Sequence, residues 1–224
     1  ALSRQSLAIV FSIFATASVV TLLLSGTFVA AMITCGILLL AHLSGRAMLS
    51  IMHANGAGLA VTVPLGLIPQ ALGGFVLAAF HMLTPATIAL MLVGMAVTSL
   101  LLAKPTGLVP PALGKPLGTA ERLPILLMFP VMFFNLVWAV VPEIQHDANH
   151  YHLAVSQSYL GSHGFIDLPY FFHSYLYRFI DMLFTIGLAL QGAEAAKLLS
   201  FAFGLVAAYG VFWLGRLAFD ERTG

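Results

Sequence analysis

The sequence has very little charge. Aspartate, glutamate, lysine and arginine together make up 8% of its 224 residues, whereas hydrophobic residues make up 60%. Soluble domains carry about 25% charged residues, so this chain has too few to cover a water-exposed globule. Its mean hydropathy of +1.01 points the same way. We therefore expect an all-α fold, a polytopic bundle of transmembrane helices surrounded by membrane lipid.

Two further shortages exclude other classes of protein. The single cysteine, Cys35, cannot form a disulfide within the chain. The net charge is only +1, which leaves no basic stripe for phosphates. Nucleic acid is therefore not an expected partner.

Long apolar runs are what the chain has in place of charge. A helix needs about 20 mostly apolar residues to cross a bilayer. Six runs approach that length: 7–24, 27–43, 57–80, 84–103, 123–141 and 195–219. Pro64 and Pro69 lie in the third run, so we expect that helix to be kinked or broken. The segment 175–190 is shorter and carries Arg178 and Asp181, which favours an interfacial helix with both charges paired on one face.

These runs divide the chain into three parts. Residues 1–103 form a block of four transmembrane helices, and a cytoplasmic linker rich in proline and glycine covers 104–122. A second module, 123–224, has a long loop at 142–174 that contains no lysine or arginine. Because basic residues near helix ends favour the cytoplasm, this loop is predicted to lie outside it. The arrangement gives six spanning helices plus the interfacial helix.

A polar cluster stands at the start of the loop, where residues 146–152 read His-Asp-Ala-Asn-His-Tyr-His. Ionisable groups beside a bilayer are costly and usually mark a substrate or ion site. Asp147 could ligate a divalent cation, accept a proton or orient an acceptor, but it is equally suited to cap a short helix. On a helix, His146, Asp147 and His150 would lie on neighbouring faces, which permits a metal site. Solvated interfacial histidines without a metal are the commoner case.

Other charged residues have both structural and functional interpretations. Glu143 and Asp167 could supply a second carboxylate beside Asp147. Glu194 and Lys197 are three positions apart, and we expect them to form a structural pair at the start of the last helix. Arg178 could bind a lipid-linked phosphate instead of pairing with its neighbour, because a guanidinium suits phosphate oxygens.

Several stretches of the second module occur in an informative order. Residues 140–142 read Val-Val-Pro, and 147–153 read Asp-Ala-Asn-His-Tyr-His-Leu. An aromatic stretch, 170–175, reads Tyr-Phe-Phe-His-Ser-Tyr, and 181–188 reads Asp-Met-Leu-Phe-Thr-Ile-Gly-Leu. With the last run, this portion resembles the N-terminal part of membrane glycosyltransferases of the GT-C superfamily. The resemblance is strongest to bacterial relatives of the protein mannosyltransferase and aminoarabinose transferase group.

The resemblance implies an enzyme of the bacterial cytoplasmic membrane. Such enzymes transfer a sugar from a polyprenyl phosphate to a lipid, glycan or protein acceptor outside the cytoplasm. Asp147 would be the catalytic carboxylate, with or without a divalent cation, although many relatives have a second acidic residue where this chain has Ala148. Substrate contacts are expected from His150, Tyr151, His152, His173, Tyr175 and Arg178. Relatives continue with further helices, so we expect this chain to be an N-terminal fragment that is inactive alone.

Two other classes of function remain compatible with the sequence. A transporter or channel would line its path with the proline-containing third helix and with Arg178 and Asp181. A non-catalytic membrane subunit would bind lipid without carrying out chemistry. Both predict helices of the same kind, so the positions of the polar residues must distinguish them.

Overall fold

The computed structural model describes residues 4–54, 57–103, 119–147, 149, 152–169, 172 and 179–218, and it has no strand among them. The helices in this part of the chain are α1 (Arg4–Leu24), α2 (Phe28–Ile51), α3 (Leu59–Ala79), α4 (Pro85–Leu102), α5 (Thr119–Val140), α6 (Leu153–Gly161), α7 (Phe179–Gln191) and α8 (Ala193–Ala218). The predicted all-α class is confirmed.

Four of these helices are long and apolar enough to cross a membrane. They are α2, α3, α4 and the Ala193–Gly215 portion of α8. The described apolar parts of α1 and α5 are shorter, Ala8–Leu24 and Leu126–Val140. The predicted bundle of six spanning helices therefore stays a prediction for α1 and α5.

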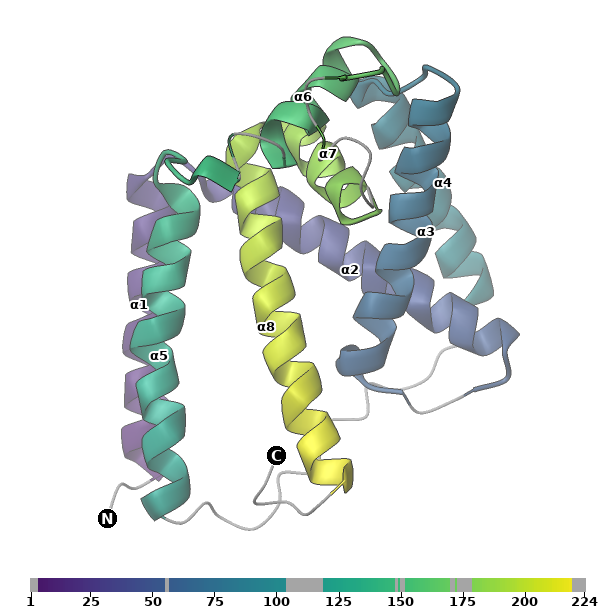
Figure 1. The fold of residues 1–224 in the computed structure, drawn as a ribbon. Helices are drawn as coiled ribbons and strands as arrows, with labels where there is room; N and C mark the ends of the chain where they lie inside the picture. Colours follow the sequence, from purple (N-terminus) through teal and green to yellow (C-terminus); the bar gives the residue numbers. More distant parts are fainter. Residues whose placement is uncertain are drawn as a thin grey trace.

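The long helices run between two ends of the bundle (Figure 1). The loop end carries α6, the end of α5 and the start of α8. The opposite end, which we call the basic end, holds the start of α1 and the ends of α2 and α8, and with them Arg4, Arg46 and Arg216. Within the bundle, α8 contacts α5 on one side and α2, α3 and α7 on the other, while α1 packs on α5. Helix α8 and a smaller contact between α1 and α2 thus join the α1–α5 pair to the rest.

Helices α2 and α3 pack with their backbones in direct contact. A Cβ atom on Gly45 of α2 would overlap the carbonyl oxygen of Thr62 in α3, and one on Gly66 of α3 would overlap the carbonyl oxygen of Ala41 in α2. Small residues permit this approach, which is the usual way helices gain packing energy in lipid. The α2–α3 hairpin is therefore a tightly packed unit of the N-terminal block.

Polar side chains near residue 43, where α2 was predicted to end, bond α2 to α3 and to α4. His42 Nδ1 lies 2.7 Å from Thr62 Oγ1 of α3. Ser44 Oγ lies 2.9 Å from Ser99 Oγ of α4, and both side chains are buried. The residues around Ser44 have small or polar side chains, a composition that is typical of loops. In the structure these side chains face neighbouring helices. The helix consequently continues to Ile51.

Helix α3 is continuous across Pro64 and Pro69. The predicted break is therefore wrong, and the predicted kink stays a prediction. Buried Gln70, directly after the second proline, donates from Nε2 to the Ile37 carbonyl oxygen of α2 at 3.1 Å. This bond ties α3 to α2 in the turn after the second proline.

Helix α7 covers part of the predicted interfacial helix at 175–190, whose position at the membrane surface stays a prediction. Its 13 residues correspond to about 20 Å, which is too short to cross a hydrocarbon core of about 30 Å. One face carries fully buried Met182 and Ile186, which belong to a core that also includes Leu199 of α8. The helix is therefore too short to span the membrane and packs against the bundle on this face.

The loop end is itself tied to the α3–α4 turn by α6, a helix that the sequence did not predict. Leu83 N donates to the His163 carbonyl oxygen at 2.8 Å, and Phe165 N donates to the Ala78 carbonyl oxygen at 3.1 Å. The Phe165 ring packs against Tyr159 of α6, with centroids 5.1 Å apart. These contacts hold one end of α6 against the bundle.

The glycine contact between α2 and α3 can be tested with a pair of variants. We expect Gly66→Ala to destabilise the protein by about 1–3 kcal/mol, because the new methyl group overlaps a backbone carbonyl that cannot rotate away. Gly36→Ala is the matched control, since a Cβ there meets nothing within 4 Å. Unfolding of both variants in detergent micelles measures the difference, and equal stability of the two would contradict the close packing.

Candidate functional site

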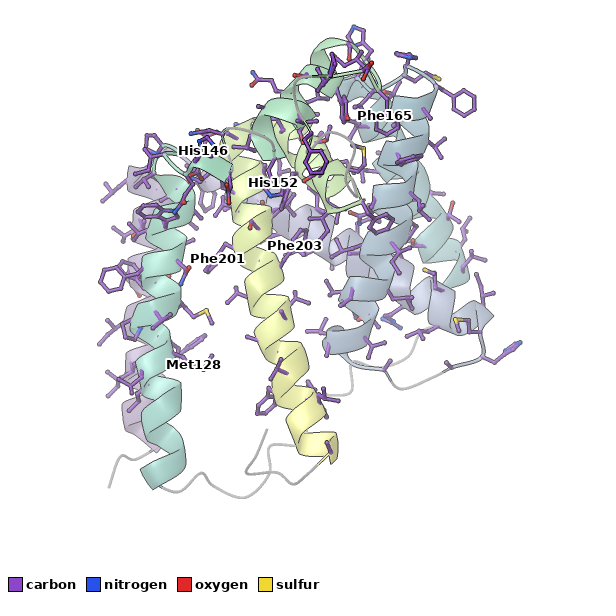
Figure 2. All side chains as sticks on the ribbon, in the orientation of Figure 1. Met128, His146, His152, Phe165, Phe201 and Phe203 are labelled. Atoms are coloured by element: carbon purple, nitrogen blue, oxygen red, sulfur yellow. The ribbon has the colours of Figure 1, made fainter. Side chains whose placement is uncertain are left out.

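A groove of about 430 Å³ lies between α5 and α8 beneath the loop end. Its lining changes in character along the two helices. Toward the basic end it is formed by Met132, Gly204 and Leu205, with Asn135, Ser200 and Phe201 nearer its middle. Phe201 points from α8 into the space between the two helices (Figure 2). At the loop end it is lined by Glu143, His152 and Lys197. The groove is therefore apolar with a charged mouth.

An ion pair links the two sides of that mouth. Lys197 Nζ in the first turns of α8 lies 3.4 Å from Glu143 Oε2, and each side chain is only 10% exposed. Lys197 also donates to the carbonyl oxygen of Val141. Glu143 accepts from the backbone of Gln145 through its other carboxylate oxygen, at 2.7 Å. The predicted pair of Glu194 with Lys197 is thus replaced by a longer-range pair across the groove.

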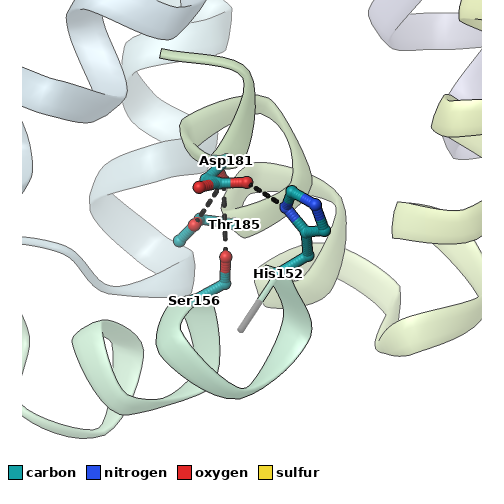
Figure 3. Close-up of polar contacts among 4 residues, drawn as sticks. All are labelled: His152, Ser156, Asp181 and Thr185. Atoms are coloured by element: carbon teal, nitrogen blue, oxygen red, sulfur yellow. Dashed lines mark hydrogen bonds and ion pairs between the residues drawn. The ribbon is translucent and has the colours of Figure 1, made fainter. Parts of the chain in front are cut away.

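A second polar pair joins α6 to α7 beside the groove (Figure 3). His152 Nδ1 lies 2.8 Å from Asp181 Oδ1, and the His152 side chain is 43% exposed while that of Asp181 is 7% exposed. Asp181 stands in the first turn of α7, where the positive end of the helix dipole favours a carboxylate. Its predicted partner, Arg178, lies outside the described residues.

Hydroxyl groups hold the backbone of Asp181 in place. Thr185 Oγ1 donates to the Asp181 carbonyl oxygen at 2.7 Å, and Ser156 Oγ of α6 donates to the same oxygen at 3.4 Å. The Phe184 ring stands edge-on to the His152 ring, with centroids 6.1 Å apart. The imidazole therefore has a defined position between a buried carboxylate and an aromatic wall of the groove.

Of the residues that the sequence predicted for the site, some line the groove, some lie away from it, and the rest lie outside the described residues. Asp147 and His146 are exposed on a short helical turn beyond α5, and neither lines the groove. His152 does line it. The other predicted substrate contacts lie outside the described residues: His150, Tyr151, His173, Tyr175 and Arg178.

The predicted metal set of His146, Asp147 and His150 is only partly described. Within the part of the chain that the structure describes, no three His, Cys, Asp or Glu residues are grouped so that they could hold a metal ion. His150 is outside that part, so this metal site stays a prediction.

Sequence reasoning missed Lys197 as a residue of the site, although a signal was present. Lys197 is a lysine at the start of a helix that was predicted to run inward from the outer side, where basic residues are disfavoured. A lysine in that position needs an anion nearby, and Glu143 provides one. The helical spacing rule pointed to Glu194 because it considers neighbours along one helix only.

Comparison with protein-family models, with curated proteins and with solved structures finds no match to this chain. Its functional interpretation consequently rests on the residues of the sequence and on the geometry of the groove.

The ion pair at the groove mouth can be tested with a double-mutant cycle. We expect Lys197→Met alone to destabilise the protein by about 3–5 kcal/mol, because it leaves Glu143 largely buried without its cation. The double variant with Glu143→Gln should recover part of that loss, which gives a coupling energy within about 0.5–3 kcal/mol. Unfolding in detergent measures all four proteins, and additive effects would show that the two side chains do not interact.

Proposed function

We propose that this chain carries the donor site of an integral-membrane glycosyltransferase that uses a sugar linked to polyprenyl phosphate. One observation carries the proposal: the groove between α5 and α8 has apolar walls and a lysine at its mouth. A polyprenyl phosphate sugar has matching chemistry, with a long hydrocarbon chain that ends in an anionic phosphate. The order of residues in 140–217, which resembles the GT-C superfamily, supports the same assignment.

Lys197 is the residue that we assign to the donor phosphate. An ammonium group has three donors and no acceptor. It can therefore keep its contacts with Glu143 and with the Val141 carbonyl oxygen and still donate to a phosphate oxygen. The isoprenoid chain would then lie along Met132, Phe201 and Leu205, toward the basic end.

Asp147 remains our candidate for the catalytic carboxylate. In the sequence it comes between Glu143 and His152, which both line the groove. Four residues of chain span at most about 14 Å, so the Asp147 backbone stays within that distance of Glu143. Its exposed side chain can orient an acceptor hydroxyl arriving from water, and a phosphate leaving group makes positioning a large part of the catalysis. His150, Tyr151, His173, Tyr175 and Arg178 stay predicted substrate contacts.

The distribution of charge supports an extracytoplasmic mouth for the groove. Arg4, Arg46 and Arg216 belong to the basic end, and basic residues near helix ends favour the cytoplasm. The loop end, with Asp147 and Asp167, then faces the outside. For a bacterial protein, this supports our proposal that the reaction takes place at the outer face of the cytoplasmic membrane.

Donor binding tests the assignment of Lys197. In nanodiscs, we expect Lys197→Gln to weaken binding of a polyprenyl phosphate sugar by about 10- to 100-fold, the effect of losing one charge-assisted hydrogen bond. Lys197→Arg keeps the charge and should bind within a few-fold of the natural protein. Polyprenol without phosphate should bind weakly to all three proteins. Equal phosphate-dependent binding by Lys197→Gln would remove Lys197 from the site.

Sugar transfer tests the role of Asp147. We expect Asp147→Asn in the full-length protein to abolish transfer and to leave donor binding and stability unchanged, because the side chain is exposed and outside the groove lining. Glu194→Gln, an exposed carboxylate in the first turn of α8, is the control and should remain active. Donor binding by a natural protein that never transfers sugar would favour the non-catalytic lipid-binding subunit instead.

A further inference from the structure

The His152–Asp181 pair has the geometry of an oriented proton acceptor. Asp181 Oδ1 lies 2.8 Å from His152 Nδ1. An ionised carboxylate can only accept hydrogen bonds, so Nδ1 carries the hydrogen in this contact. In a neutral imidazole the lone pair is then on Nε2. Figure 3 shows this second ring nitrogen pointing away from Asp181.

The imidazole is presented to the groove by well-packed elements. Asp181 belongs to α7, whose residues Met182 and Ile186 are fully buried. The Thr185 and Ser156 hydroxyls hold the Asp181 carbonyl oxygen, so this turn is fixed from both α7 and α6. His152 itself lines the groove together with Lys197 and Glu143, and its side chain is 43% exposed. A water-borne hydroxyl and a membrane-borne donor can therefore meet at the edge of this ring.

We propose that His152 accepts the proton of the acceptor hydroxyl during sugar transfer, with Asp181 as a positioning residue that fixes the ring. This inference rests on the proposed function, and it adds a proton acceptor to the site. The acceptor oxygen forms a bond to the anomeric carbon of the sugar as the bond from that carbon to the phosphate oxygen breaks. The bonding electrons leave with the polyprenyl phosphate, and the hydroxyl proton moves to His152 Nε2. The exposed ring then releases this proton to water.

The charged groups around His152 are compatible with this role. Asp181 faces Nδ1 from α7, and its carboxylate stabilises the imidazolium that forms when the proton arrives. Glu143 and Lys197 line the same groove from the loop and from α8, and they are paired with each other. Asp147 retains its separate task of orienting the acceptor. An analogous division of labour, with a carboxylate holding a histidine that moves the proton, operates in hydrolase triads.

The pH dependence of transfer at saturating donor provides the test. In the natural full-length protein, the rate should fall as the solution is acidified, because a protonated ring cannot accept the hydroxyl proton, and it should level off on the alkaline side. His152→Gln should lower the plateau by about 10²- to 10⁴-fold and remove this acid limb. Asp181→Asn should lower the plateau by about 10- to 100-fold and keep the limb, because the ring remains but is less well oriented. Donor binding should stay within a few-fold in both variants.

Matched controls separate a chemical role from a structural one. His163→Asn replaces an exposed histidine just beyond the other end of α6, where φ is 59°, a conformation that asparagine tolerates. It should keep both the rate and the acid limb. Glu194→Gln, at an exposed carboxylate in the first turn of α8, serves in the same way for Asp181→Asn.

Two results would overturn the proposal. One is a His152→Gln variant that keeps the natural rate and the same acid limb. The other needs no variant: a natural protein whose transfer rate stays constant as the solution is acidified does not use a neutral imidazole as its proton acceptor. A natural protein that neither binds nor uses polyprenyl phosphate sugars contradicts the proposed function itself, a different outcome from transfer that is independent of His152.

Discussion

The loop end of this protein depends on keeping each ionisable group near lipid beside a counter-charge or a hydrogen-bond partner. Charge is scarce in the chain, and two of its acidic residues hold together elements that are distant in sequence. Glu143 holds Lys197, which fixes the start of α8 to the segment after α5. Asp181 holds His152, which fixes the start of α6 to the start of α7. Because leaving either carboxylate without its partner is costly, these pairs determine the shape of the groove mouth.

Much of the helical architecture follows from hydropathy, and the differences have local physical reasons. The six apolar runs all became helices, because long apolar segments must satisfy their backbone groups internally. The end of α2 was placed too early because Ser44 and Gly45 have loop-like composition, yet both are buried against neighbouring helices. Helix α6 has only nine residues and weak amphipathic character, so its sequence contains little periodic signal.

The sequence predicted where the candidate site lies better than it predicted which residues form it. The polar loop after the fifth run does border the groove, and His152 was among the predicted contacts. Lys197 was assigned to Glu194, because helical spacing favours partners three positions away. Its partner in the structure is Glu143, from another element. Asp181 contacts His152 of another element as well, while its predicted pairing with Arg178 stays a prediction because Arg178 lies outside the described residues. Pairing across elements depends on how the helices are arranged, which a single sequence does not contain.

The pairing of α1 with α5 has a consequence for biosynthesis. The helix made directly after α1 contacts it less than α5 does, whereas α2 has its largest contact with α3, the next helix along the chain. The main partner of α1 begins only at Thr119, so the ribosome completes three more helices before that partner exists. Membrane proteins are made N-terminus first. During synthesis α1 must therefore stay in the lipid or at the insertion machinery, with the face that later meets Phe129 and Phe133 still uncovered.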